Sequence, residues 1–173
     1  MFDDQATGAH SLRDAKREEL YGDWLRAAQY SDFIGVQNYE RAVWDDKGKL
    51  PAPQGATLNY MGSEVYAPSL ANAVRYAHEV TGKPILVTEH GVGTDDDRIR
   101  ADFIPAALTE LKKIMDAGVP VAGYVHWALL DNFEWIGGFT PHFGLHTVDL
   151  QTLKRQPKPS ALVYRDIAKS NSV

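Results

Sequence analysis

Residues 84–91 read Pro-Ile-Leu-Val-Thr-Glu-His-Gly, a short apolar run that ends on a carboxylate at Glu89. Its β-branched residues predict a buried strand, and Pro84 prevents a preceding helix from continuing into it. A second apolar run covers residues 121–127, and an acidic, aromatic stretch, Asp-Asn-Phe-Glu-Trp, follows at 131–135. We therefore expect carboxylates at the tips of two buried strands. Two strand-end carboxylates beside tryptophans form a rarer sequence pattern than a single strand-end carboxylate.

Amphipathic helices are expected around these strands. Residues 11–29 carry Tyr21, Trp24, Leu25 and Ala28 at the spacing of one inward helix face. A second helix begins with Ser69 as N-cap, turns Val80 inward and ends at Gly82. A third follows a turn at 91–97 and runs to about Ala117, with Met115 inward and Pro105 as a kink or true start. The remaining expected elements are a strand at 32–37, a long irregular stretch at 40–67, an accessory strand at 147–149 and a helix at 159–169.

Near-continuous apolar strands that alternate with helices indicate an α/β fold with a parallel sheet. Functional residues at the carboxyl ends of the strands favour a (β/α) barrel, and a doubly wound sheet is the alternative. The run Gly91-Val92-Gly93 lacks the third glycine of a dinucleotide fingerprint, so it does not support that alternative. The expected strand at 121–127 is apolar on both faces, as a buried parallel strand should be.

Only three main strands are evident, whereas a closed barrel needs eight. Three parallel strands leave two unpaired edges and much uncovered apolar surface. We therefore expect residues 1–173 to be a piece of a larger barrel, or to associate so that those edges are covered.

Composition excludes several classes of function. Apolar residues make up 44% of the chain and charged residues 24%, which is typical of a globular domain. A net charge of −5 and the lack of a basic stripe argue against nucleic acid as a partner. No cysteine is present, so disulfides and thiolate metal sites are excluded. No apolar window approaches a membrane span, and the first residues do not resemble a signal peptide; if Met1 is the true start, we expect a cytoplasmic protein.

Each candidate site residue also has a simpler explanation. Glu89 could cap a turn, Trp127 and Trp135 could pack in the core, and Tyr39 could be a buried tyrosine with a satisfied hydroxyl. Glu134 is harder to explain as a surface charge, because its neighbours favour burial. The histidines at 90, 126, 142 and 146 lack the spacing of a zinc motif, and the acidic run 95–97 is better explained as the start of a helix. We expect no metal and no cofactor.

Five segments, in order, resemble the C-terminal portion of the family 1 glycoside hydrolases, the retaining β-glucosidase group. Residues 32–39 (DFIGVQNY) are similar to the family's sixth strand, 84–91 (PILVTEHG) to its seventh, and 123–135 (GYVHWALLDNFEW) to its eighth strand and loop. Residues 143–149 (FGLHTVD) and 154–160 (KRQPKPS) are similar to the segments that follow. The resemblance covers nearly everything from Asp32 onward. It implies that the chain is a partial (β/α)8 TIM barrel, its last three βα units.

The resemblance implies roles for six residues. Glu89 would be the catalytic nucleophile, and Tyr39 would orient its carboxylate. The pocket for the sugar would be formed by Trp127, Glu134, Trp135 and Phe143. The chain departs from the family pattern at three positions, where His90, Ala128 and His142 replace the usual Asn, Ser and Arg; these should tune the neighbours of the site.

A larger departure concerns the proton donor. The family's acid/base glutamate lies in an Asn-Glu-Pro motif on the fourth strand, and this sequence contains no such motif. A retaining glycosidase needs two carboxyl groups about 5–5.5 Å apart, one to attack and one to protonate the leaving oxygen. We therefore expect residues 1–173 to be the C-terminal fragment of a single barrel catalytic domain, inactive or nearly so alone.

The expected substrate class is a β-linked saccharide or an aryl β-glycoside. The expected partner is a chain that supplies the N-terminal barrel strands, or a second copy of this one. The alternative function is a non-catalytic, carbohydrate-binding or self-associating remnant of a truncated gene.

Overall fold

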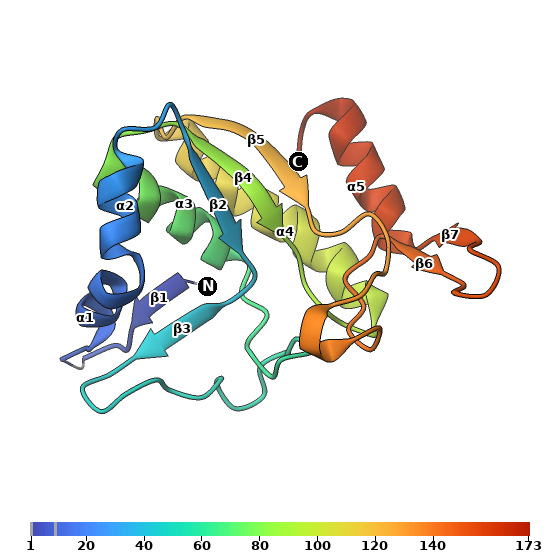
Figure 1. The fold of residues 1–173 in the computed structure, drawn as a ribbon, viewed down its shortest axis with the longest axis horizontal. Helices are drawn as coiled ribbons and strands as arrows, with labels where there is room; N and C mark the ends of the chain where they lie inside the picture. Colours follow the sequence, from blue (N-terminus) through green and yellow to red (C-terminus); the bar gives the residue numbers. More distant parts are fainter. Residues whose placement is uncertain (1, 9) are drawn as a thin grey trace.

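The computed structural model describes residues 2–8 and 10–173. Figure 1 shows the arrangement of the helices and strands. In chain order they are β1 (Phe2–Gln5), α1 (Arg13–Arg17), the π-helix η1 (Glu18–Gly22), α2 (Asp23–Ala28), β2 (Ile34–Asn38), β3 (Arg41–Trp44), α3 (Pro68–Thr81), β4 (Ile85–His90), α4 (Asp97–Asp116), β5 (Val121–His126), the 3-10 helix η2 (Trp135–Gly137), β6 (His146–Val148), β7 (Arg155–Pro157) and α5 (Pro159–Ser170).

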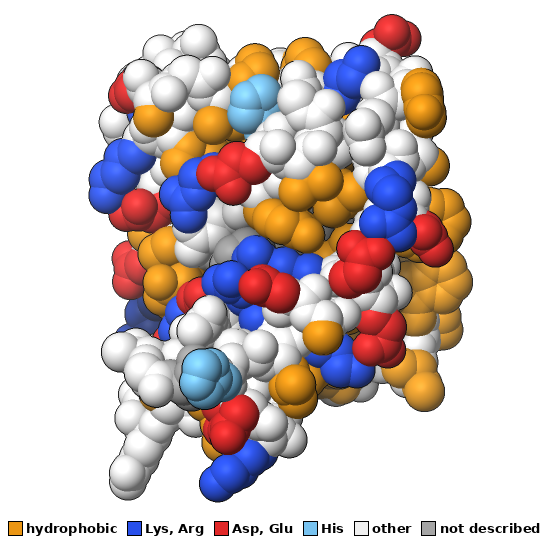
Figure 2. Space-filling model, turned by 90° about the vertical axis from the view of Figure 1, so that its left-hand side faces the viewer, with side chains coloured by type: hydrophobic (Ala, Val, Ile, Leu, Met, Phe, Trp, Pro, Cys, Tyr) orange, Lys and Arg blue, Asp and Glu red, His pale blue; other side chains and the backbone are white. Residues whose placement is uncertain are grey.

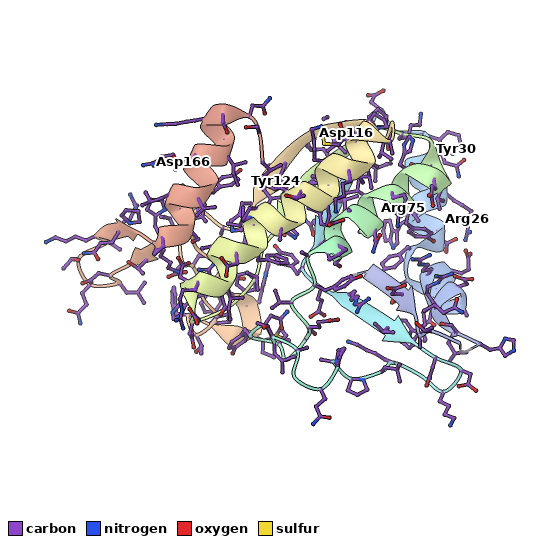
Figure 3. All side chains as sticks on the ribbon, turned by 180° about the vertical axis from the view of Figure 1, so that it is seen from behind. Arg26, Tyr30, Arg75, Asp116, Tyr124 and Asp166 are labelled. Atoms are coloured by element: carbon purple, nitrogen blue, oxygen red, sulfur yellow. The ribbon has the colours of Figure 1, made fainter. Side chains whose placement is uncertain are left out.

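Three parallel strands form the central sheet, in the order β2–β4–β5. Val36 lies opposite Val87, and Val87 opposite Tyr124, so the three strands end along the same edge of the sheet. Helices α3 and α4 cover one face and α5 packs on α4, as the view from behind shows (Figure 3). The α/β prediction is confirmed.

The main core lies between this sheet and the helices. Leu70 and Val74 of α3, Ile85 and Val87 of β4, and Ile104 of α4 are fully buried there. Burial of each such side chain contributes roughly 1.5–3 kcal/mol. The core therefore holds the strand that carries Glu89 rigidly against two helices.

The opposite face of the sheet, toward the viewer in Figure 1, carries no helix in the described part of the chain. Gly35 and Gln37 of β2 are exposed there, although the alternate residues of that strand are buried. In β5, Val125 is 50% exposed. The strand at 121–127 is therefore apolar on both faces, as expected, but buried on only one, because only one face of the sheet is covered.

The free edge of β2 faces an apolar groove. Tyr21, Trp24 and Leu25 line it on one side, and Phe33 and Tyr76 contribute further aromatic surface. Its volume is about 400 Å³. The side of the molecule that carries α1 and α2 accordingly shows apolar side chains among the charged ones (Figure 2). An unpaired strand edge beside apolar surface is a place where further chain can pack.

A small two-stranded sheet lies at the N-terminal end, where β1 pairs in parallel with β3. The buried carboxylate of Asp3 accepts a hydrogen bond from Trp44 Nε1 at 2.6 Å, which ties the two strands together. The prediction that residues 40–67 are wholly irregular is therefore wrong over 41–44. Pairing with β1, which is distant in sequence, stabilises residues 41–44. No local sequence pattern predicts such a pairing.

The predicted helix at 11–29 is found as three helical segments with a π-helical middle. Trp24 is 78% exposed, so its predicted inward orientation is wrong; it stands at the rim of the groove, where no described element covers it. Val80 and Met115 are exposed as well, because each lies in the last helical turn, beyond the edge of the core.

Two predicted helix boundaries also differ. Helix α3 starts at Pro68, so Ser69 lies inside the first turn and does not cap it. Helix α4 starts at Asp97, with Asp96 as its N-cap, and continues through Pro105, which is therefore not its start. No helix in residues 2–8 and 10–173 has the length and apolar content of a membrane span.

Candidate active site

The carboxyl ends of the three central strands open into one cleft. Its volume is about 400 Å³. It contains all six residues that the sequence predicts for a site: Tyr39, Glu89, Trp127, Glu134, Trp135 and Phe143. Segments distant in sequence meet here because parallel strands place their carboxyl ends along one edge of the sheet.

Glu89, near the end of β4, is held by two donors from the neighbouring strand and its extension. Gln37 Nε2 donates to Oε1 at 2.9 Å, and Tyr39 Oη donates to Oε2 at 2.6 Å. Burial, together with the hydrogen bond to Glu89, raises the pKa of the Tyr39 phenol, so it remains a neutral donor. Both carboxylate oxygens are thus fixed in direction. The Tyr39 ring itself packs edge-on against Phe143, with centroids 5.7 Å apart.

Glu134 lies on the loop that follows β5. Trp127 Nε1 donates to Glu134 Oε1 at 3.1 Å, so the indole directs this carboxylate at the cleft. The neighbours of Glu134 are not buried: Phe133 is 60% and Trp135 is 84% exposed. The expectation that the neighbours of Glu134 are buried is therefore wrong. Of the two, Trp135 lines the cleft, where its exposed ring offers an apolar surface, whereas Phe133 packs against Phe139.

Two glycines allow the walls of the cleft to lie close to each other. A Cβ on Gly91 would lie 2.0 Å from the carbonyl oxygen of Trp127, and one on Gly93 would lie 2.8 Å from the Phe143 ring. No side chain fits at either position. The Gly-Val-Gly run therefore brings the end of β4 against the end of β5 and the aromatic wall.

His90 faces away from the cleft. It is fully buried on the helix side of β4, stacked on Phe103 with centroids 5.0 Å apart, and its Nδ1 lies 2.9 Å from Tyr124 Oη. Burial lowers the pKa of His90 to about 3, so the ring is neutral. His90, which is expected to tune neighbours of the site, does not line the cleft, because strand alternation turns the side chain after Glu89 to the other face.

Comparison with known sequences identifies the family to which the chain belongs. The sequence model of glycosyl hydrolase family 1 matches residues 23–173. The chain belongs to glycosyl hydrolase family 1. It is 40% identical over 175 residues to Beta-glucosidase 44 of Arabidopsis thaliana, a match that covers 82% of this chain and 34% of that protein. It is 32% identical over 157 residues to the Beta-galactosidase of Sulfolobus acidocaldarius, covering 82% of this chain and 32% of that one.

Solved structures agree with this family 1 assignment. The apo structure of a beta-glucosidase 1317 superposes with a TM-score of 0.90 at 41% identity, over 99% of this chain and 42% of the other. The crystal structure of beta-glycosidase BGL167 gives a TM-score of 0.91 at 35% identity, over 99% and 41%. The chain thus spans about a third of the length of the curated relatives it matches.

The site of this family 1 chain also includes residues that the sequence analysis missed: Gln37, which donates to Glu89, and four further residues that line the cleft. Gln37 could have been found, because it pairs in register with Glu89 and shares the exposed face of β2. The others come from the start and the middle of the irregular stretch, where no periodicity places them: Glu40, Asn59, Tyr60 and Met61. In residues 2–8 and 10–173, no three His, Asp or Glu side chains lie close enough together to hold a metal ion.

Proposed function

We propose that this chain supplies the nucleophile and the sugar-binding half of a retaining β-glycosidase site. The observation that carries the proposal is the fixed carboxylate of Glu89, which accepts hydrogen bonds from Gln37 and Tyr39 in the same cleft as the Trp127–Glu134 pair. Names of the relatives, beta-glucosidase and beta-galactosidase, support β-glycosides as the substrate class.

The chemistry follows from these contacts. An ionised Glu89 oxygen attacks the anomeric carbon, the bond from that carbon to the leaving oxygen breaks, and the leaving oxygen takes a proton from a second carboxyl group. Tyr39 and Gln37 direct the attacking oxygen. Glu134 accepts from the Trp127 indole and is suited to bind sugar hydroxyls. Water then hydrolyses the glycosyl–Glu89 ester.

The proton donor is proposed to lie on polypeptide that precedes the match in family relatives. We infer that β2, β4 and β5 are the sixth, seventh and eighth strands of an eight-stranded barrel. Support comes from their order, their parallel pairing and the superposition of nearly the whole chain on 42% of a relative. The uncovered face and the two unpaired edges of the sheet are where the other strands would pack.

A mixing experiment tests the proposal. The partner is the part of a family 1 relative that precedes its match to this chain, produced as a separate polypeptide. We expect the mixture to hydrolyse an aryl β-glucoside while each part alone does not, and Glu89→Gln to remove the activity. Glu79→Gln, at an exposed position on α3, is the matched control and should leave it unchanged. Unchanged turnover in Glu89→Gln would remove Glu89 from the nucleophile role.

A second candidate function rests on the open sheet. Exposed Gly35, Gln37 and Val125 on its uncovered face, with unpaired edges on β2 and β5, also suit a non-catalytic, self-associating or carbohydrate-binding chain. Sugar binding by this chain, without restored hydrolysis in any mixture, would favour this second function.

A further inference from the structure

A buried arginine behind the cleft joins three segments of chain. Arg100 of α4 is fully buried, and its Nη2 donates to the carbonyl oxygens of Thr94 at 3.2 Å, Val92 at 3.3 Å and His142. Its Nη1 pairs with Asp97. One guanidinium therefore fastens the segment after β4 to the end of the loop that carries Glu134. Only an arginine has enough donors in a fixed plane to do this.

An aspartate closes the same loop at its base. Asp131 Oδ1 accepts from the backbone N–H of Gly144 at 2.8 Å and from Lys158 Nζ at 2.8 Å. Asp131 and Gly144 are the two ends of the loop, so this carboxylate holds the ends together. Lys158 and Asp131 are both largely shielded from solvent, which strengthens their ion pair relative to a surface pair.

The Arg100–Asp97 pair and the Asp131–Lys158 pair both reach the start of α5. Asp97 Oδ2 accepts from the backbone N–H of Ser160 at 2.8 Å, and Asp97 Oδ1 accepts from Ser160 Oγ at 2.7 Å. Ser160 lies two residues after Lys158. We call Arg100, Asp97, Asp131 and Lys158 the polar clamp. It joins the loop to α4 and α5, the helices that pack on each other behind the sheet.

The loop between the clamped ends carries side chains of the cleft. Outside the polar clamp, its C-terminal part is also bonded to the framework: Thr94 N–H donates to the His142 carbonyl at 3.1 Å, and Ala128 N–H donates to the Phe143 carbonyl at 3.2 Å. Trp135 is largely exposed, and Glu134 meets the framework through Trp127. Phe143 lies between His142 and Gly144, whose backbones the polar clamp holds. The polar clamp therefore acts together with the bond from Ala128 N–H to the Phe143 carbonyl in placing this ring against Tyr39.

We propose that Arg100 and Asp131 are positioning residues, which hold loop 131–144 so that Glu134 and Phe143 face Glu89. The part of this proposal that concerns sugar binding rests on the proposed function. The part that concerns the order of the loop does not, and it can be tested on this chain alone.

Hydrogen exchange on the chain alone is the first test. In Arg100→Lys and in Lys158→Met, the amides of 134–144 should exchange at least about tenfold faster, equivalent to about 1.4 kcal/mol, while those of β4 keep their rates. Arg98→Lys, on the exposed side of the same helix, and Lys154→Met are matched controls. Unchanged loop exchange would overturn the proposal, and so would an equal rise in β4, which indicates general destabilisation. If Arg100→Lys does not fold, Lys158→Met decides.

Kinetics of the reassembled enzyme are the second test. Because Gln37 and Tyr39, and not the polar clamp, hold Glu89, Lys158→Met should raise KM about tenfold and change kcat by less than about threefold. Tyr39→Phe should show the reverse pattern. An unchanged KM would overturn the sugar-binding part. If the unmodified mixture is inactive, the proposed function fails, and the exchange result alone decides whether the polar clamp orders the loop.

Discussion

Acid should unfold this protein through two buried histidines. His90 and His126 flank the hydroxyl of Tyr124, with Nδ1 atoms 2.9 and 3.1 Å from it. Burial lowers the pKa of each ring to about 3. The charge of Arg100 lowers the pKa of His126 further, whereas the charge of Asp97 acts to raise it. No such charge raises the pKa of His90. Both rings are therefore neutral in the folded protein at neutral pH.

The magnitude follows from proton linkage. An unfolded histidine has a pKa of about 6.5, so between about pH 6.5 and pH 3 the unfolded chain binds a proton that the folded chain does not. Stability therefore falls as the pH falls through that window, by about 1.4 kcal/mol per pH unit for each ring. At pH 5 the loss is about 2 kcal/mol per histidine relative to pH 7.5. This is a large part of the stability of an ordinary domain.

Replacement of His90 by Asn removes one titrating group. The urea concentration at half-unfolding, followed by tryptophan fluorescence at pH 7.5 and pH 5.0, should fall less on acidification in His90→Asn than in the unmodified chain. The difference should be about 2 kcal/mol after conversion with the urea dependence. His10→Asn, at an exposed position, is the matched control. Equal losses of stability in His90→Asn and the unmodified chain would refute the reasoning.

Three further outcomes are expected. Tyr39→Phe removes a donor to the Glu89 carboxylate, a bond of about 1.5–3 kcal/mol, and should lower kcat of the reassembled enzyme about tenfold to a hundredfold in an aryl β-glucoside assay. Gly91→Ala places a Cβ 2.0 Å from the Trp127 carbonyl and should lower the melting temperature far more than Gly123→Ala, whose Cβ meets only the tip of Leu86 at 3.1 Å. The chain alone should form oligomers in gel filtration because β2 and β5 have unpaired edges; a monodisperse monomer would contradict this.

The central sheet could be predicted from sequence because its signals are local. Residues 85–88 are apolar or β-branched, Pro84 and Gly91 flank the strand, and the structure places β4 at Ile85–His90. Strand β2 and the order of helices around it followed from the same kind of pattern. Of the predicted cleft residues, Tyr39, Glu89 and Trp127 lie at or just after strand ends, and parallel pairing brings those ends together. The other three lie on the loop that follows β5, namely Glu134, Trp135 and Phe143.

Elements that depend on distant partners could not be predicted in this way. Strand β3 exists because β1 pairs with it, and the indole of Trp44 needs the carboxylate of Asp3. The polar clamp likewise joins Arg100 to carbonyl groups at 92, 94 and 142, and a sequence pattern carries no signal for backbone acceptors. Trp24 has the helical spacing of a buried face but is exposed, because no described element covers it.

The contacts of Glu89 allow the attack of this carboxylate to be considered apart from protonation of the leaving oxygen. Its donors, Gln37 and Tyr39, belong to this chain, so the attacking carboxylate is aligned without a second polypeptide. The proton donor matters only when the leaving oxygen is basic. A dinitrophenyl 2-deoxy-2-fluoro-β-glucoside releases a stable phenolate as the Glu89 oxygen bonds to the anomeric carbon, and that step needs no proton.

We therefore expect this chain alone to form a slow, stoichiometric adduct with that reagent. Mass spectrometry should show one added fluoroglucosyl group on the peptide that contains Glu89. Glu89→Gln should remain unlabelled, and Glu79→Gln should be labelled at the unmodified rate. An unlabelled native chain under conditions where the reassembled enzyme is labelled would show that strands outside this chain are needed to align Glu89, contrary to the geometry of its two hydrogen bonds.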